Sequence, residues 1–186
     1  MITKEHLTQS GLEKILSIKG ALNWGNSELL TNSFPSVKPI ERPSYIINVK
    51  TLNPYWVAGF TSGEGCFDIS VTDSRHVGKR FRITQHVRDE ALLVSLISYF
   101  GCGNYSESKS KNYGQYKCSK FSDVVNNIIP FFKQYPVLGV KAEDFKDWCK
   151  VEDIIKAGKH LTRSGFAEVI KIKKGMNKGR SDSEDE

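Results

Sequence analysis

The sequence predicts an α+β domain in which helices cover one face of an antiparallel sheet. Residues 66–72 (CFDISVT) and 80–85 (RFRITQ) alternate apolar and polar side chains, as strands with one buried face do. Segments with helical spacing of apolar residues lie before and after the strands, which gives the order α-β-β-α-β-β-α with additional helices. Helices stacked on the apolar side of such a sheet leave its other side polar and exposed.

The elements of this domain are bounded by caps and turns. Asn53 is expected to cap a helix that has Pro54 at its first position and ends at Gly65, about three turns later. The stretch RDEALLVSLISYF has helical spacing and ends before Gly101. A turn at residues 76–79 and the loop KSKNYG are expected to close two hairpins, the second formed by NYSES and GQYKCSK. Further helices are expected over residues 121–134, 141–156 and 164–176.

The composition indicates a small basic globular protein. The chain has 186 residues, of which 39% are hydrophobic, enough for one core. Its formal net charge is +6, but the last six residues (SDSEDE) hold four acids, so the rest of the chain carries +10. This charge favours a polyanionic partner such as nucleic acid, and a solvated cationic surface is the alternative.

Neither the cysteines nor the apolar segments indicate a zinc site or a membrane span. Cys66, Cys102, Cys118 and Cys149 stand singly, without the paired spacing of zinc ligands. No apolar run approaches the ~18 residues that a membrane helix needs, and the start MITKEHLTQS lacks the apolar core of a signal peptide. We therefore expect a soluble protein of a reducing compartment, with free thiols and no membrane partner.

A long internal repeat relates the two ends of the chain. Residues 6–25 align without gaps to residues 160–179 and share nine of twenty residues, at an offset of 154. A repeat of this length indicates a duplicated domain, because solenoid repeats have periods of ~20–50 residues. The shared residues include a capping threonine and serine and a closing Asn-x-Gly, which argues against chance similarity of two amphipathic helices. We therefore expect the chain to open on the last helix of a preceding copy.

The repeat and the prolines together predict four segments. Pro35, Pro39, Pro43 and Pro54 lie between the first helix and the predicted domain, and their spacing favours an extended connector. We expect an orphan helix from a preceding repeat in residues 1–31 and a proline-rich linker in residues 32–52. The αββαββα domain is expected in residues 53–180, followed by a disordered acidic tail in residues 181–186.

The polar face of the expected sheet carries residue types that bind duplex DNA. A two-stranded ribbon fits the major groove, where arginine bonds guanine and glutamine bonds adenine, while lysine binds phosphates. A solvated sheet face is the alternative, and the excess of cations favours nucleic acid. The candidate DNA-binding residues are Asp68, Ser70, Thr72, Ser74, Arg75, Arg80, Arg82, Thr84, Tyr105, Glu107, Lys109, Lys111, Tyr113, Gln115 and Lys117.

The segment VAGFTSGEG, residues 57–65, places one acid between two glycines at the end of a helix. Ala58 and Ser62 lie one turn apart, with Gly59 and Gly63 on the adjacent stripe, so one side of the helix is almost free of side chains. A partner helix can approach such a side closely, which makes these four the candidate domain-interface residues. At the helix C-terminus the macrodipole disfavours the charge of Glu64 by ~0.3–1 kcal/mol. A divalent cation would reverse that penalty, because a carboxylate and free backbone carbonyls form an oxygen site suited to Mg²⁺.

These residues resemble the motif of the LAGLIDADG homing endonucleases. VAGFTSGEG corresponds to the nine-residue motif, and ITQH, KFSD, GVKAEDFKDWCK and MNKGR are similar to the single-chain, two-domain members found in organellar introns. The resemblance covers about residues 53–180. It implies a homing-endonuclease-like αββαββα domain with a saddle-shaped antiparallel sheet, and it implies a sequence-specific double-stranded DNA endonuclease. It also implies an organellar location, the mitochondrial matrix in particular.

The resemblance further implies roles for single residues. Glu64 corresponds to the metal-binding acid at the eighth motif position, and with the carbonyl of Gly63 it would hold Mg²⁺ and help to align water for attack on a phosphodiester. Gln85 and Lys120 fall where the family keeps a polar residue and a lysine near the scissile phosphate. Each has an alternative interpretation, Gln85 as a residue at the edge of the core and Lys120 as a phosphate anchor. The sixth motif position, often acidic in the family, is Ser62 here.

One departure from the family pattern concerns the number of motif helices. Members of the family pair two motif helices, each with one acid, whereas this chain has one. We therefore expect half of an enzyme that pairs with a second LAGLIDADG domain, either a missing first half or another copy of itself. The alternative function is a non-catalytic nucleic-acid-binding module, such as an intron RNA maturase or a ribosome-associated remnant, with RNA as the partner.

Overall fold

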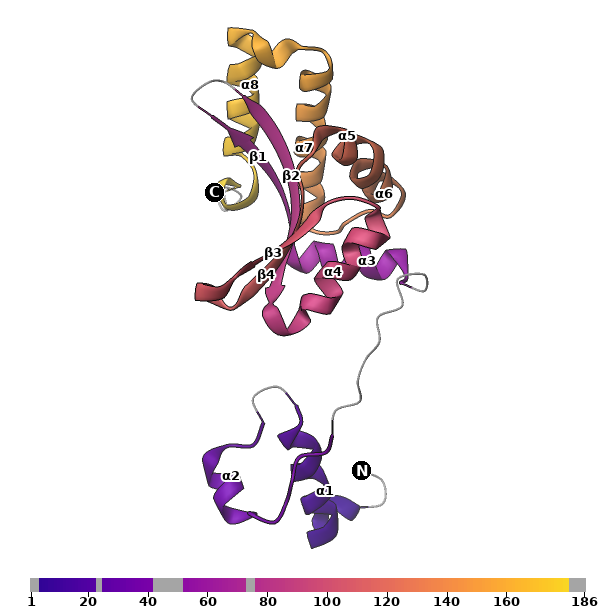
Figure 1. Ribbon diagram of the computed structural model, residues 1–186, viewed down its shortest axis with the longest axis vertical. Helices are drawn as coiled ribbons and strands as arrows, with labels where there is room; N and C mark the ends of the chain where they lie inside the picture. The colour runs from indigo at the N-terminus through magenta and orange to yellow at the C-terminus, as the bar shows by residue number, and fades with distance from the viewer. Residues whose placement is uncertain (1–3, 23–24, 42–51, 73–75, 181–186) are drawn as a thin grey trace, which may run out of the picture. The chain divides into compact units, whose positions relative to one another are not determined.

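The computed structural model describes residues 4–22, 25–41, 52–72 and 76–180, and the chain divides into two compact units, residues 1–46 and 47–186. The first unit holds short helices, and the second holds the sheet with its helices (Figure 1). None of the helices in these ranges is long and apolar enough to cross a membrane. The four cysteines are free thiols, as expected.

The second unit has the predicted order of elements. Its helices and strands are α3 (Pro54–Glu64), β1 (Gly65–Val71), β2 (Val77–His86), α4 (Glu90–Phe100), β3 (Asn104–Ser108), β4 (Tyr113–Cys118), α7 (Val140–Lys156) and α8 (Arg163–Lys174). Between β4 and α7 runs a composite helix of α5 (Phe121–Asp123), a π-helical turn η5 (Val124–Ile128) and α6 (Ile129–Gln134). Short 3-10 turns are η3 (Val87–Asp89), η4 (Lys109–Lys111), η6 (Lys159–Leu161) and η7 (Asn177–Gly179). The π-helical turn, which the sequence did not predict, lies just before Pro130, a residue with no amide proton to donate within a helix.

The four strands form one antiparallel sheet in the order β1-β2-β4-β3. This confirms the predicted fold class. The sheet is strongly twisted, so that the β1-β2 and β3-β4 hairpins point in different directions (Figure 1). Residues 66–72 and 80–85 alternate as predicted, because every second residue of β1 and β2 is buried.

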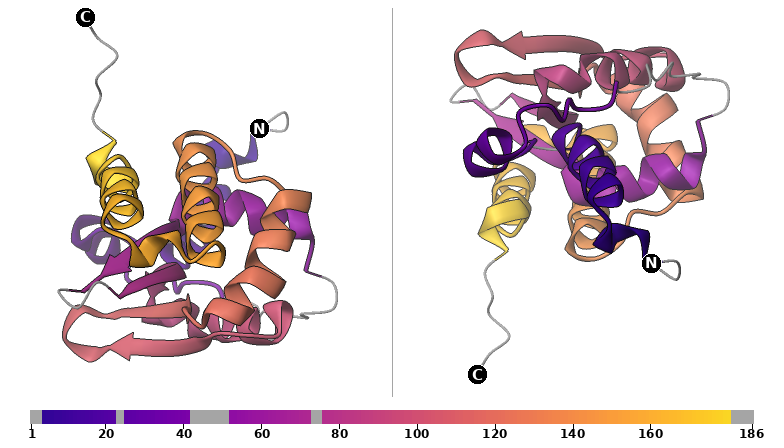
Figure 2. Two further views of the ribbon diagram at one scale, coloured as in Figure 1. Left: turned by 90° about the horizontal axis from the view of Figure 1, so that it is seen from above. Right: turned by 90° about the horizontal axis from the view of Figure 1, so that it is seen from below.

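One face of the sheet is buried under the helices, and this layer forms the core (Figure 2). Phe67 lies at its centre, with its ring centroid 5.3 Å from that of Phe81 and 5.2 Å from that of Trp148. Such aromatic pairs add about 0.5–1.5 kcal/mol each beyond the burial of their area. The largest fully buried side chains are Trp148, Tyr116, Phe67, Lys79, Phe81, Phe132, Ile69, Ile83, Leu93, Leu96, Ile128 and Val57.

The C-terminal turn η7 is fixed to strand β1 by Asn177. This residue has a left-handed backbone (φ 54°), and its side-chain amide donates to the carbonyl of Phe67 at 3.0 Å. Its backbone N–H donates to the buried carboxylate of Asp144 at 2.9 Å. These bonds place residues 177–179 beside the start of β1, next to Cys66.

The N-terminal unit repeats the local structure of the C-terminal end of the chain. It contains η1 (Glu5–Leu7), α1 (Gln9–Gly20) and α2 (Glu28–Ser33). The Thr8 hydroxyl accepts from the N–H of Gly11 at 3.0 Å, and the equivalent Thr162 accepts from Gly165 at 3.1 Å. The same 3-10 turn, threonine cap and twelve-residue helix therefore occur at an offset of 154, which supports the duplication that the sequence predicts.

The first part of the expected linker, up to residue 41, is folded in the N-terminal unit. Residue 31 lies inside α2, and residues 34–41 fold back on α1 rather than extending away from it. The Ser17 hydroxyl donates to the carbonyl of Lys38 at 2.7 Å, and the backbone N–H of Ile40 donates to that of Ser17 at 3.1 Å. Residues 42–51 of the predicted linker and the predicted disordered tail, residues 181–186, lie outside the described residues.

Candidate nucleic-acid interface and catalytic site

Helix α3 presents the predicted catalytic acid at its last position. The side-chain oxygen of Asn53 accepts from the N–H of Tyr55 at 2.8 Å, and Pro54 occupies the first turn, as expected for the start of this helix. The helix ends at Glu64, whose side chain is exposed and makes no hydrogen bond or ion pair within the described chain. Such a carboxylate, exposed at a helix C-terminus and unpaired among the described residues, is available to bind a cation.

The side of α3 with small residues divides into a covered and an uncovered stripe. A methyl group at Gly59 or Gly63 would meet no atom outside the local helix backbone within 4 Å among the described residues. Ala58, by contrast, is buried in the chain's own core. The Ser62 hydroxyl donates to the Ala58 carbonyl at 2.8 Å and accepts from the N–H of Leu138 at 3.0 Å. The glycines therefore remain available to a partner, whereas the expectation for Ala58 is wrong and Ser62 is engaged with its own chain.

Apolar side chains that the sequence analysis did not select flank the glycine stripe. Tyr55 and Trp56 are exposed at the start of α3, and so are Leu138, on the loop that Ser62 anchors, and Val140, the first residue of α7. Together with Ser62 and Gly63, this loop lines a pocket of about 520 Å³. Apolar residues next to a proline occur in exposed and in buried loops alike. The sequence alone therefore did not predict that the loop at Leu138 is exposed.

The register of the sheet decides which predicted DNA-binding residues share its exposed face. Arg80 lies opposite Asp68, Arg82 opposite Lys117, and Thr84 opposite Gln115. Ser70 and Tyr113 lie on the same face, and Thr72 follows the end of β1. Residues of this face that the sequence analysis missed are Cys66, His86, Asn104, Ser106 and Ser108, which the pairing of the strands identifies.

Strand β3 has the opposite phase to the one expected. Tyr105 pairs with Tyr116, and Glu107 pairs with Gly114, so both lie on the helix-covered side of the sheet. The Tyr105 hydroxyl lies so close to Gly114 that a methyl group there would come within 2.4 Å of it. The expectation that Tyr105 and Glu107 face the exposed side is therefore wrong. Lys109 and Lys111 lie in the η4 turn between the strands, and Ser74 and Arg75 lie outside the described residues.

Two residue pairs on the exposed face are already hydrogen-bonded. The guanidinium of Arg80 donates to Asp68 through its Nε, at 2.8 Å from Oδ2, and through its Nη2. The side-chain amide of Gln115 donates to the Thr84 hydroxyl at 2.9 Å. These contacts hold an arginine and a glutamine in fixed orientations on a surface that water can reach.

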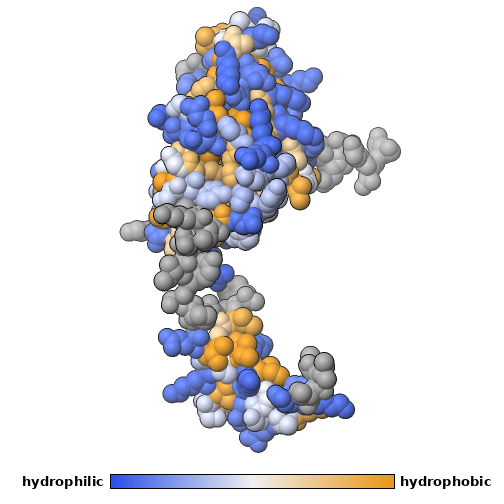
Figure 3. Space-filling view, turned by 90° about the vertical axis from the view of Figure 1, so that its right-hand side faces the viewer, coloured by the Kyte–Doolittle hydropathy of each residue, from blue (hydrophilic) through white to orange (hydrophobic). Residues whose placement is uncertain are grey.

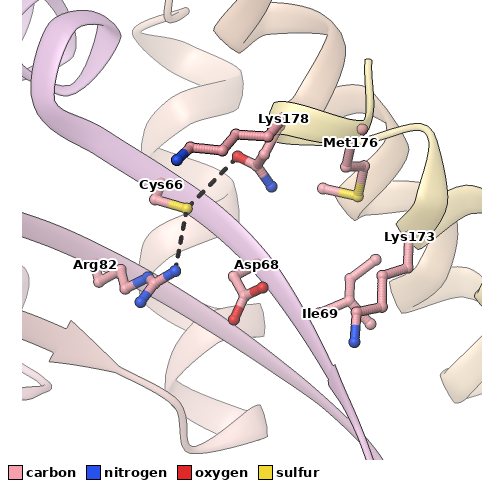
Figure 4. A pocket seen from close by; sticks show the side chains of 9 residues that line it. Cys66, Asp68, Ile69, Arg82, Lys173, Met176 and Lys178 are labelled. Carbon is pink, nitrogen blue, oxygen red and sulfur yellow. Dashed lines mark hydrogen bonds between the residues drawn. The ribbon is translucent and has the colours of Figure 1, made fainter. Parts of the chain in front are cut away.

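A second pocket, of about 350 Å³, lies where β1, β2 and the C-terminal turn meet (Figure 4). Arg82 donates through its Nη2 to the sulfur of Cys66 at 3.7 Å, and its Nε is buried without a hydrogen-bond partner in the described chain. Lys173 and Lys178 also line the pocket. With these three cations against the single carboxylate of Asp68, the lining of the pocket has an excess of positive charge, which is suited to phosphate.

The structure links neither Gln85 nor Lys120 to Glu64 by a hydrogen bond or an ion pair among the described residues. Gln85 pairs with Gly114 on the helix side of the sheet, two residues beyond Ile83, which pairs with Gly65. Lys120 is exposed, and its ammonium lies 3.5 Å from the carboxylate of Asp123. Among the described residues, the three predicted catalytic side chains make no hydrogen bond or ion pair with one another. No cluster of three His, Cys, Asp or Glu side chains in the described chain could hold a metal ion.

Comparison with known proteins agrees with this architecture. The family model described as LAGLIDADG endonuclease matches residues 57–152. The probable intron-encoded endonuclease 2 of Neurospora crassa is 36% identical over 185 residues, which is 95% of this chain and 41% of the relative. The probable intron-encoded endonuclease 3 of the same fungus is 36% identical over 89% of this chain and 32% of its own length.

Solved structures show the same fold at closer sequence identity. The LAGLIDADG homing endonuclease I-SmaMI bound to cleaved DNA has a TM-score of 0.89 and 45% identity, over 96% of this chain and 61% of that one. I-LtrWI bound to target DNA has a TM-score of 0.90 and 39% identity over the same shares. The chain thus spans less than half of these curated relatives and about three-fifths of the solved proteins. On the strength of the matched motif, the sheet and these relatives, the chain belongs to the LAGLIDADG endonuclease family.

Proposed function

We propose that this chain is one half of a Mg²⁺-dependent, sequence-specific DNA endonuclease, completed by a second LAGLIDADG domain. One observation carries the proposal. Glu64 is exposed at the junction of α3 and β1, between the uncovered Gly63 and the strand whose outer face pairs Asp68 with Arg80. A candidate catalytic acid, a surface for a partner helix and a surface for DNA therefore meet within a few residues.

Duplex DNA is the proposed substrate. The exposed sheet face carries Arg80, Arg82 and Lys117, and the pocket beside it adds Lys173 and Lys178. Cations of this kind bind phosphates, and an antiparallel ribbon fits the major groove. The solved relatives I-SmaMI and I-LtrWI were both bound to DNA, which supports the same partner for this chain.

Mg²⁺ is the proposed cofactor, held by the Glu64 carboxylate and the Gly63 carbonyl. These oxygens fit a hard cation, and Gly63 is the last residue but one of α3, beyond Thr61, whose carbonyl accepts from the N–H of the capping Gly65. The described chain supplies only part of a ligand set, so DNA phosphates and the second domain complete it. When bound, the ion stabilises the attacking and leaving oxygens of phosphodiester hydrolysis.

Gln85 and Lys120 are proposed to assist the hydrolysis. A side-chain amide such as that of Gln85 can orient a water, and an ammonium such as that of Lys120 can offset charge that develops on the phosphate. Lys120 is suited to this role because its partner Asp123 holds it only by a surface ion pair, which contributes at most about 1 kcal/mol. DNA can therefore displace the pair at little cost.

The partner that we propose is a preceding domain rather than another copy of this chain. Ile15 of α1 and Leu22 just after it are exposed, although their repeat equivalents pack in the core of the C-terminal domain. Ile15 is 45% exposed and Leu22 57%, whereas the equivalent Val169 is 0% exposed and Met176 4%. Figure 3 shows apolar side chains gathered on the surface of the N-terminal unit. A helix with the sequence and cap of α8 is best explained by a domain that covers it in the same way.

The second part of the pairing surface is the glycine stripe of α3. Gly59 and Gly63 allow a helix to approach closely, and Tyr55, Leu138 and Val140 supply apolar contacts around them. The length of the relatives supports a second domain, because this chain covers 61% of each solved protein. The description of the two Neurospora crassa relatives as intron-encoded endonucleases supports an organellar location, for which we propose the mitochondrial matrix.

The proposal is tested by cleavage of long duplex DNA. The purified chain, alone and joined to a first LAGLIDADG domain, is incubated with a library of long duplexes in Mg²⁺ and in EDTA, with structured RNA in parallel. We expect double-strand cleavage only by the paired protein and only with Mg²⁺. Paired protein that binds duplex DNA and never cleaves it would contradict the catalytic proposal, and a preference for structured RNA would favour a maturase-like module.

A further inference from the structure

Arg80 and Arg82 lie two residues apart on the exposed side of β2, but their surroundings differ. The side chain of Arg80 is 40% exposed and pairs with Asp68, whose side chain is 18% exposed. The Nε of Arg82 is buried without a partner in the described chain, and its Nη2 faces the sulfur of Cys66. Arg80 therefore has a fixed anionic partner, whereas Arg82 has none among its hydrogen bonds.

The contact with Asp68 occupies only one edge of the Arg80 guanidinium. Oδ2 accepts from Nε and from Nη2, which together form the side of the planar group nearest its stem. A guanidinium has five N–H donors in a fixed fork, so the outer edge, with one N–H from Nη1 and one from Nη2, makes no hydrogen bond with any residue that the structure describes. The Arg80 side chain is 40% exposed, so a ligand can reach it although it is paired with Asp68.

Asp68 is itself held in place. Its backbone carbonyl accepts from the indole N–H of Trp148 at 3.0 Å, and Trp148 is fully buried in the core. Its Cα lies directly opposite that of Arg80 in the antiparallel ladder. The arginine is thereby oriented before any ligand binds, which reduces the side-chain entropy that binding would cost.

An oriented arginine with two parallel free donors matches guanine. In the major groove guanine presents two acceptors, O6 and N7, whereas adenine presents an acceptor and a donor. The donor of adenine would face one N–H of Arg80, and the carboxylate of Asp68 prevents the guanidinium from turning its other edge to the base. We propose that Arg80, positioned by Asp68, recognises one guanine in the DNA half-site of this chain, an inference that rests on the proposed DNA binding.

The test is the base preference of variants of the paired protein. The chain joined to a first LAGLIDADG domain selects from a pool of randomised duplexes, as the wild type and as Arg80→Gln, Arg80→Lys, Asp68→Asn and Arg82→Gln. Arg80→Lys keeps the positive charge and loses the ability to form a bidentate hydrogen bond with the base. Arg82→Gln is the matched control, with the same charge change on the same strand and face. Circular dichroism melting confirms that each variant is folded before selection.

We expect the wild type to prefer guanine at one half-site position by about 10- to 100-fold, and both Arg80 variants to lose that preference there alone. Asp68→Asn should reduce the same preference while keeping overall affinity, because it loosens the arginine without removing it. Arg82→Gln should weaken binding to all sequences evenly.

Two results would overturn the inference, and they are distinguishable. If Arg80→Lys keeps the wild-type preference at every position, or if Arg82→Gln and not the Arg80 variants removes a guanine preference, the assignment to Arg80 is wrong and the proposed DNA binding stands. If the wild-type pair selects no duplex at all, the proposed DNA binding fails and this inference fails with it.

Discussion

The ammonium group of Lys79 lies 4.0 Å from the centre of the Trp148 ring, on the buried face of the sheet. Only 1% of this lysine is exposed, and its Nζ makes no hydrogen bond in the described chain. The Glu152 carboxylate is 3.9 Å away and also binds Lys156 at 2.5 Å. Burial lowers the pKa of Lys79 from its ordinary value of 10.5 to about 8, and the nearby acids only partly oppose this.

This lowered pKa predicts a stability that rises with pH. Between about pH 8 and 10.5 the folded chain has released the Lys79 proton, whereas the unfolded chain still binds it, so unfolding becomes less favourable as pH rises. The destabilising contribution of the buried charge is fully present below pH 8. Its size is on the order of 3 kcal/mol, since each unit of pKa shift corresponds to about 1.4 kcal/mol.

Urea denaturation of the wild type and of Lys79→Met at several values between pH 7 and 10.5 measures this effect. Most other titrating groups contribute equally to the unfolding free energy of both proteins, so they cancel in the difference between the two values. Cys149 is the exception, because its thiol also titrates near Lys79, so Lys79→Met is compared again in a Cys149→Ala background. A difference that stays flat across this range would show that the pKa of Lys79 in the folded chain stays near its ordinary value, so that burial does not lower it.

Gly59 and Gly65 should respond in opposite ways to the same substitution. Gly59→Ala adds a methyl group to an uncovered helical position, so the isolated chain should gain up to about 1 kcal/mol from helix propensity and lose affinity for the first domain. Gly65→Ala places a methyl group 2.5 Å from the Thr61 side chain and should cost about 1–3 kcal/mol. Denaturation curves and sedimentation with the first domain measure both effects. Unchanged pairing of Gly59→Ala would show that the glycine stripe is not the interface.

Ile15 and Val169 occupy equivalent positions of the repeat and offer a second matched pair. Ile15→Asp changes an exposed residue and should alter the stability of the isolated chain by no more than about 0.5 kcal/mol. Val169→Asp buries an unpaired charge in the core and should cost more than about 4 kcal/mol. In the protein joined to its first domain, however, Ile15→Asp should become as damaging as Val169→Asp. Thermal melting of the four proteins checks this, and a harmless Ile15→Asp in the joined protein would mean that no domain covers α1.

The sequence predicted those parts of the fold in which local pattern and burial agree. Strands β1 and β2 alternate cleanly because one face packs on helices, and α3 has both a capping residue, Asn53, and a proline in its first turn. The short strand β3 has no such pattern, since Tyr105 is its only large apolar residue. Its phase follows from pairing with β4, which is a tertiary property, so the sequence placed Tyr105 and Glu107 on the wrong face.

Other features depend on contacts between residues distant in the chain. The prolines before residue 41 suggested an extended linker, but Pro39 packs against Gly20 and the segment bonds to Ser17. The exposed loop at Leu138 is held by a bond to Ser62, 76 residues earlier. Asp68 and Arg80 were predicted to share a face, whereas their direct pairing follows from the register of the hairpin.

Strand-resolved cleavage by a Glu64→Gln variant tests the central claim most directly. The chain, joined to a first LAGLIDADG domain, is incubated with end-labelled duplex target in Mg²⁺, and the cut of each strand is followed separately. Glu64→Gln should bind the duplex as tightly as the wild type, because the side chain keeps its size and DNA loses no cationic partner. Cleavage should slow by about 100-fold or more. Wild-type rates of cutting on both strands by this variant would contradict the assignment of Glu64 as the metal-binding acid.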